Sequence, residues 1–193
     1  MSRLQQMLAE FYRLAQPVPE FMNYIRQHQL NLADLRSEIG IFGVAMCRRF
    51  EWQDGSPGFE FSAQGIPCAV IEAVCYRRED GLIEPYPADL VAWPLSHPSS
   101  FATALGPHDG AELLGPLAAV QRGGQPLKVF RTPLRWLLAN GEGVVLLKPG
   151  AEFWLHQAGS PFIAEDFRHA IELRELLGHK HKILVPSVER LVA

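Results

Sequence analysis

The chain has 193 residues, of which 48% are hydrophobic and 20% are charged, and its formal net charge at pH 7 is −3. These values are ordinary for a folded globular protein and exclude a disordered or low-complexity chain. No apolar stretch approaches the roughly 20 residues that a membrane-spanning helix needs. The first residues lack the charged head and apolar block of a secretory signal. We therefore expect a cytoplasmic protein that forms one domain, with or without an appended subdomain.

Charge is distributed unevenly along the chain. Residues 51–110 carry nine acidic and two basic side chains, whereas both flanking segments are slightly basic. An acidic middle segment argues against a grip on the phosphate backbone of a nucleic acid. It is typical of a solvated face, and also fits a surface that meets a basic partner or a metal.

The three cysteines indicate a reducing compartment. Cys68 and Cys75 are seven residues apart and would point to opposite faces of a shared strand, which argues against a disulfide or a common metal between them. With Cys47 they are best interpreted as small apolar side chains.

The first forty residues are predicted to be helical. Apolar side chains follow helical spacing over residues 2–15, where Ser2 can cap the helix and Pro17 ends it. A second helix is predicted over residues 20–29 and a third, short one over residues 31–39. We interpret residues 1–40 as a helical N-terminal segment.

Aromatic and β-branched residues then dominate, as is typical of strands. Three or four strands are predicted within residues 41–52, 58–62, 66–76 and 89–93. Turn-forming residues separate them, at 54–58, 80–81 and 85–87. We expect an antiparallel β meander. Its central strand would be 66–76, because both alternating faces of residues 68–76 are apolar apart from Glu72.

A loop-rich stretch follows from residue 94 to residue 126, with short helices predicted over residues 99–105 and 111–120. Beyond it, short apolar runs alternate with helix-like segments. The runs cover residues 127–130, 144–147, 161–164 and 183–185, and the helices cover 132–140, 149–157 and 166–177. This order is typical of βαβ units, whose strands run parallel and are buried on both faces.

The fold class predicted is therefore α+β, with N-terminal helices, an antiparallel β meander and a C-terminal βαβαβ-like half. Residues 41–193 would form one domain, with the meander over 41–110 and the alternating part over 111–193. Whether the two sheet regions fuse into one mixed sheet stays open.

Three residues are candidates for acid–base catalysis. Glu72 would be a carboxylate on a buried strand, where burial can raise its pKa into a catalytic range. The alternatives are a salt bridge to Arg77 or Arg48, or an edge strand where Glu72 meets water. His97 and His108 lie in a segment rich in histidine, serine and aspartate, the residue types of a hydrolytic triad. No Gly-x-Ser-x-Gly turn accompanies them, and the same residue types form ordinary turns and caps.

Four charged residues are candidates for ligand binding. Arg131, Lys148, Glu165 and Asp166 directly or closely follow predicted parallel strands, and sheets of this kind hold ligands beyond the carboxyl ends of their strands. The alternative for Asp166 is a helix-capping role, as it is for Thr132 before Pro133.

The sequence indicates no metal and no cofactor. It contains neither CxxC nor HExxH, and His179 with His181 are interpreted as part of a polar connector. Gly141-Glu142-Gly143 precedes a predicted strand, whereas a dinucleotide-binding loop follows one.

Two classes of function remain. The preferred one is a non-catalytic binding, interaction or assembly-accessory protein that acts with a protein partner or as a homo-oligomer, without a membrane. The alternative is a small enzyme with hydrolase-like acid–base chemistry on a polar metabolite or a nucleic acid. The enzyme would require a concave pocket in which several of the candidate side chains converge.

Overall fold

The computed structural model describes residues 1–14, 19–30, 40–79, 82–116, 125–159 and 161–186, with backbone only over 76–79 and 82–85. The predicted third helix and the turn at 80–81 lie outside these residues. Within them, the α+β class is confirmed: helices accompany two separate five-stranded sheets, so the two sheet regions do not fuse. The helices are α1 (Arg3–Leu14), α2 (Pro19–Gln27), α3 (Gly106–Asp109), α5 (Pro133–Leu138), α6 (Glu152–Ala158) and α7 (Phe167–Leu177).

The first sheet is a closed barrel in the order β1-β2-β5-β4-β3. Neighbouring strands are antiparallel except for β2 and β5, which run parallel and close the ring. β3 pairs with β1 rather than with β2, the strand before it in the chain. Its strands are β1 (Phe42–Glu51), β2 (Pro57–Phe61), β3 (Ile66–Glu79), β4 (Leu82–Pro94) and β5 (Ala102–Thr103).

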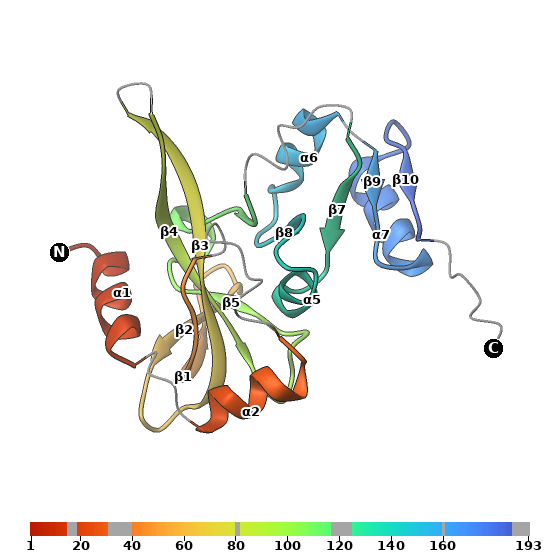
Figure 1. Cartoon of the computed structure of the whole chain (residues 1–193). Helices are drawn as coiled ribbons and strands as arrows, with labels where there is room; N and C mark the ends of the chain where they lie inside the picture. Colours follow the sequence, from red (N-terminus) through yellow and green to blue (C-terminus); the bar gives the residue numbers. More distant parts are fainter. Residues whose placement is uncertain (15–18, 31–39, 80–81, 117–124, 160, 187–193) are drawn as a thin grey trace, which may run out of the picture.

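The turn predicted at residues 85–87 is wrong, because β4 runs straight through it. Pro85 and Pro87 pair with Tyr76 and Val74 of β3. Among the described residues, β3 is the only strand that pairs with residues 82–88, so these positions lie at a sheet edge. A proline is tolerated there because its missing N–H is not needed to bond a second strand. Figure 1 shows this part of β3 and β4 as a two-stranded arm that extends beyond the barrel.

The second sheet has the order β10-β9-β7-β8-β6 and lies to one side of the barrel (Figure 1). β8, β7, β9 and β10 are parallel, which confirms the prediction for the C-terminal runs, and β6 is antiparallel at the edge. The strands are β6 (Leu113–Leu114), β7 (Leu127–Phe130), β8 (Val144–Leu146), β9 (Phe162–Ile163) and β10 (Ile183–Leu184).

The short helices predicted between the two sheets are wrong. Residues 99–105 contain the closing strand β5, and residues 111–120 contain β6 in their described part. Two-residue strands carry no periodicity that a sequence pattern could reveal, and their partners are distant in the chain.

Both faces of β3 and β4 are buried over residues 68–73 and 89–94, within the strand predicted at residues 66–76 and the strand paired with it. One set of side chains, including Val70 and Leu90, packs with Phe11 of α1. The other set, including Ile71 and Trp93, packs against α5 and the second sheet. The apolar face of α1 is therefore covered by the barrel.

Asp89 joins the barrel to the second sheet. It is fully buried on β4, and its carboxylate accepts four backbone N–H bonds, including one from Ala104 at 3.1 Å and one from Ala111 at 3.2 Å. Ala111 leads directly into β6, so one side chain fixes where the second sheet begins.

None of the helices in the described part of the chain combines the length and the apolar character needed to cross a membrane.

Candidate functional site

The order of the parallel strands reverses between β7 and β9, so a topological switch point lies between these two strands. From β7 the chain passes through α5 to β8 on one side, and from β9 it passes through α7 to β10 on the other. The two loops that leave β7 and β9 therefore diverge, which opens a crevice beyond the carboxyl ends of these strands.

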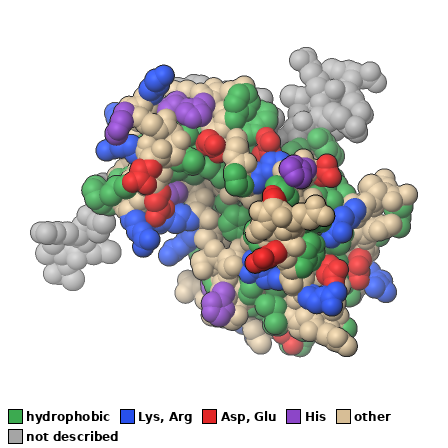
Figure 2. Space-filling view, turned by 180° about the vertical axis from the view of Figure 1, so that it is seen from behind, with side chains coloured by type: hydrophobic (Ala, Val, Ile, Leu, Met, Phe, Trp, Pro, Cys, Tyr) green, Lys and Arg blue, Asp and Glu red, His purple; other side chains and the backbone are tan. Residues whose placement is uncertain are grey.

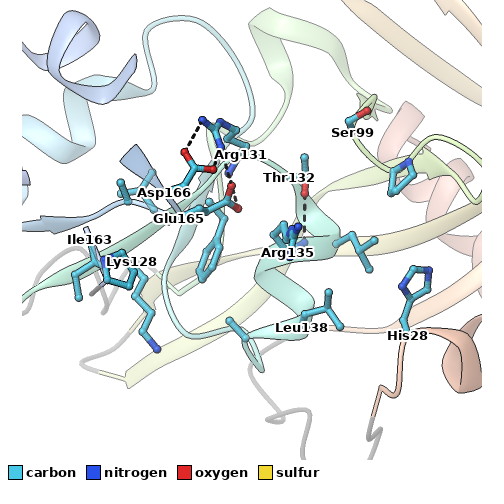
Figure 3. Close-up of a pocket in the computed structure, with 17 residues that line it drawn as sticks. His28, Ser99, Lys128, Arg131, Thr132, Arg135, Leu138, Ile163, Glu165 and Asp166 are labelled. Carbon is cyan, nitrogen blue, oxygen red and sulfur yellow. Dashed lines mark hydrogen bonds and ion pairs between the residues drawn. The ribbon is translucent and has the colours of Figure 1, made fainter. Parts of the chain in front are cut away.

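A pocket of about 890 Å³ occupies this crevice (Figure 3). One wall comes from the ends of β7 and β9 and from α5. The opposite wall comes from the N-terminal half of the chain, through His28 after α2 and Pro98 and Ser99 after β4. The pocket is thus built jointly by the two sheets and their flanking segments.

Arg131 is held at this edge by three carboxylates. Its guanidinium makes two bonds to Asp166, at 2.8 and 3.2 Å. A third bond runs from Nε to Glu172 at 2.8 Å, and Nη1 lies 3.4 Å from Glu165. Hydrogen bonds to Arg131 hold the pKa of Asp166 and of Glu172 below their usual range. Arg131 is therefore engaged as a structural cation rather than free for a ligand.

The capping roles suggested for Thr132 and Asp166 are confirmed. Thr132 Oγ1 accepts the Arg135 N–H at 3.3 Å, where α5 begins, and Asp166 Oδ1 accepts the His169 N–H at 2.7 Å, where α7 begins. Asp166 thus caps a helix and binds Arg131 at the same time.

His169 fixes the backbone of Glu165, one of the carboxylate residues that bind Arg131. It is buried, and its Nδ1 accepts the backbone N–H of Glu165 at 3.1 Å. Burial lowers the pKa of His169, and the nearby Arg131 lowers it further. The ring is therefore neutral at pH 7, with Nδ1 as acceptor.

Two cations on the lining are better placed than Arg131 to meet a ligand. Arg135 is exposed, and its guanidinium has no ion-pair partner among the described residues. Lys128 pairs with Glu142 at 3.0 Å, with both side chains nearly half exposed, so water screens this bond. The lining also includes five apolar residues, Val129, Phe130, Leu134, Leu138 and Ile163.

The four predicted ligand-binding residues do not all meet. Arg131, Glu165 and Asp166 converge on the pocket. Lys148 follows β8 at the same sheet edge, but its ammonium group bonds the carbonyl of Gly110 at 3.0 Å and lies 3.6 Å from Glu112. Lys148 therefore faces the connection between the barrel and the second sheet instead of the pocket.

Glu72 lies outside the pocket. It is buried on β3, accepts a hydrogen bond from the Tyr12 hydroxyl, and accepts the Ile41 N–H at 2.8 Å. The burial predicted for Glu72 is confirmed, whereas the suggested bridge to Arg48 is wrong, because Arg48 pairs with Glu60 on the barrel surface. A tyrosine sixty positions earlier in the chain takes that role.

His97 and His108 do not join Glu72 in one site. His97 is exposed in the turn after β4, where its Nδ1 lies 3.0 Å from Ser96 Oγ. His108 is exposed on α3. Neither residue lines the pocket with Glu165, so the three candidates for acid–base catalysis are dispersed over the barrel and its loops.

The described residues contain no group of three or more His, Cys, Asp or Glu placed to hold a metal ion. The three cysteines are free thiols, with Cys47 and Cys68 buried in the barrel.

Several pocket residues escaped prediction from the sequence. Arg135 and Lys128 lie within four residues of Arg131, so the end of β7 and the start of α5 carried a signal for both. His28 and Ser99 carried none, because only the packing of the barrel against the second sheet places them opposite α5.

No known protein family, curated protein or solved structure matches this chain.

Proposed function

We propose that this chain is a non-catalytic binding protein whose site is the pocket beyond the carboxyl ends of β7 and β9. The observation that carries the proposal is that the pocket lies at the switch point of the parallel strands. Open sheets with parallel strands hold their ligands at this point, because diverging loops leave a crevice there.

The lining favours a small anionic ligand with an apolar body. Arg135 presents a planar fork of donors that suits a carboxylate or a phosphate, and Lys128 is a second cation on the lining (Figure 3). The apolar part of the lining includes Phe130 and Leu138. A ligand that combines one anionic group with an aliphatic or aromatic body would satisfy both parts of the lining.

Two observations support binding over catalysis. The carboxylates of Glu165 and Asp166 are bound to Arg131, and the lowered pKa of Asp166 keeps it ionised near neutral pH, where it cannot donate a proton. The alternative enzyme would use Glu72, His97 or His108 together with Lys148 or Glu165, and none of the first three residues lines the pocket that contains Glu165.

A ligand screen by thermal unfolding tests the proposal. Aliphatic and aromatic carboxylates and phosphate esters are compared with their uncharged analogues, because a ligand that binds the folded state raises the unfolding temperature. We expect stabilisation by anionic members that carry an apolar body, and little from the neutral analogues.

The matched variants are Arg135→Met and Arg174→Met. Both arginines are exposed, and Arg174 on α7 lies outside the pocket lining. Loss of a charged hydrogen-bond donor should weaken binding roughly 10- to 100-fold in Arg135→Met, measured by isothermal titration calorimetry. Equal affinity of both variants for every ligand would contradict the site.

A further inference from the structure

Two histidines meet at the outer end of the second sheet, away from the proposed pocket. His156 lies in the last turn of α6, and His181 lies just before β10. His156 Nδ1 and His181 Nε2 are 3.0 Å apart, and the ring centroids are 5.1 Å apart. In Figure 2, histidine side chains gather at the end of this lobe beside basic side chains.

The two imidazoles are held in place by different parts of the fold. His156 belongs to α6, so its backbone is fixed by the helix. The His181 ring packs on Phe162 of β9, with centroids 5.4 Å apart. The carbonyl of Lys182, the next residue, accepts the Phe162 N–H at 2.9 Å. The position of the His181 ring against His156 is therefore set by the sheet.

A direct contact between two ring nitrogens requires one to donate and the other to accept, so the accepting ring is neutral. A neutral imidazole nitrogen is also the commonest metal ligand in proteins. Coordination by both facing nitrogens requires that the hydrogen between them move, either to the other nitrogen of the donor ring or to solvent.

The spacing selects a coordination geometry. With nitrogens 3.0 Å apart and metal–nitrogen bonds of about 2.05 Å, the angle at the metal would be about 94°. This is close to the roughly 90° between neighbouring ligands of a square-planar or octahedral ion and far from the roughly 109° of tetrahedral Zn²⁺. Each lone pair must turn by roughly 40° toward the ion, through rotation about the broad χ2 torsion of each ring; His156 is exposed and His181 is half-buried.

We propose that His156 and His181 form a two-histidine site for a divalent transition-metal ion, with Cu²⁺ as the preferred ion. Imidazole ligands and a near-right angle suit tetragonal Cu²⁺, which also stands highest in the order of divalent affinities. Water fills the remaining coordination positions, because no third His, Cys, Asp or Glu of the described chain joins the pair. The bound ion would tie α6 to the edge strand β10.

Copper binding by the whole chain tests this site. The probe is Cu²⁺ alone, titrated calorimetrically into wild type, His156→Ala, His181→Ala and the control His179→Ala. His179 is exposed and two residues from His181, so its replacement matches the surface change without touching the pair. The unfolding midpoint without metal shows that each variant is folded, and His156→Gln and His181→Gln replace the alanine variants if it falls.

We expect one tight site in wild type and in His179→Ala, weakened roughly tenfold or more when either member of the pair is lost, because two tethered ligands act together. Electron paramagnetic resonance should show two coordinated nitrogens in wild type and fewer in the single variants. Equal copper affinity in all four proteins, or a loss in His179→Ala as large as in His181→Ala, would overturn the proposal.

Discussion

Replacement of Asp89 by asparagine should destabilise the protein at acid pH and stabilise it at alkaline pH. Asp89 is fully buried, and burial raises the pKa of its carboxyl to about 7, while four backbone N–H donors oppose the rise. A carboxyl whose pKa is raised on folding holds its proton more tightly in the folded state. Its stabilising contribution is therefore complete below the unfolded pKa of 3.8 and is lost as the pH rises through about 7.

The magnitude follows from the size of the shift. Each pKa unit corresponds to about 1.36 kcal/mol, so a rise from 3.8 to about 7 removes roughly 4 kcal/mol of wild-type stability between pH 4 and pH 8. Asparagine does not titrate. It places an amide N–H₂ opposite one of the backbone donors, such as Ala111, at a constant cost of about 1–2 kcal/mol. The two stability curves should therefore cross between these pH values.

Urea unfolding of wild type and Asp89→Asn at pH 4.5, 6 and 8 measures the difference in free energy directly. Other titrating groups, such as Asp166 and His169, are common to both proteins and cancel in that difference. A constant deficit of the asparagine variant at every pH would refute the reasoning. It would mean that the carboxylate stays ionised and that its four N–H bonds outweigh burial.

Three further predictions concern single contacts. Glu72→Ala should lower the free energy of unfolding in urea by about 2–4 kcal/mol, because it leaves the Ile41 N–H without its acceptor. Tyr12→Phe, which removes the hydroxyl that bonds Glu72, should lower it by about 1 kcal/mol. A loss below about 0.5 kcal/mol for Glu72→Ala would contradict these contacts. Because burial lowers the pKa of His169, wild type should lose stability relative to the non-titrating His169→Asn as the pH falls from 7 to 5, and parallel unfolding curves would count against this. Gly143→Ala should lower the thermal midpoint strongly, because Gly143 has φ +122° and an added Cβ would lie 2.4 Å from a backbone oxygen of β7; an unchanged midpoint would rule out that close approach.

Most of the secondary structure in the C-terminal half could be predicted from the sequence. The run at residues 127–130 coincides with β7, and the other parallel strands and their helices lie within a few residues of their predicted bounds. These segments are apolar runs bounded by turn and cap residues, and both signals are local. The edge that carries Arg131, Glu165 and Asp166 follows from the parallel order alone, so these residues could be placed together before any side chain was seen.

The features that could not be predicted from the sequence depend on contacts between distant segments of the chain. The closure of the barrel needs β2 to meet β5, which has only two residues. The partner of Glu72 is Tyr12, brought across by α1, and the partner of His181 is His156, brought across by α6. No local pattern marks such pairs, because tertiary packing chooses them after the elements have formed.

The far wall of the pocket has the same origin. His28 and Ser99 follow elements of the barrel half, and they reach α5 only because Trp93 and Trp136 share one buried cluster between the sheets. When two parts of a fold form a site together, the sequence predicts only the residues that lie in regularly patterned segments. Here those residues belong to the connection between β7 and α5.

Mapping of amide chemical shifts by nuclear magnetic resonance tests the central claim most directly. The anionic ligand that most stabilises wild type is titrated into labelled protein. We predict saturable shifts of the backbone amides at residues 128–139 and 163–166, with smaller ones near His28 and Ser99. Shifts confined to the barrel around Glu72 or His108, with those pocket amides unmoved, would contradict a binding site at the switch point.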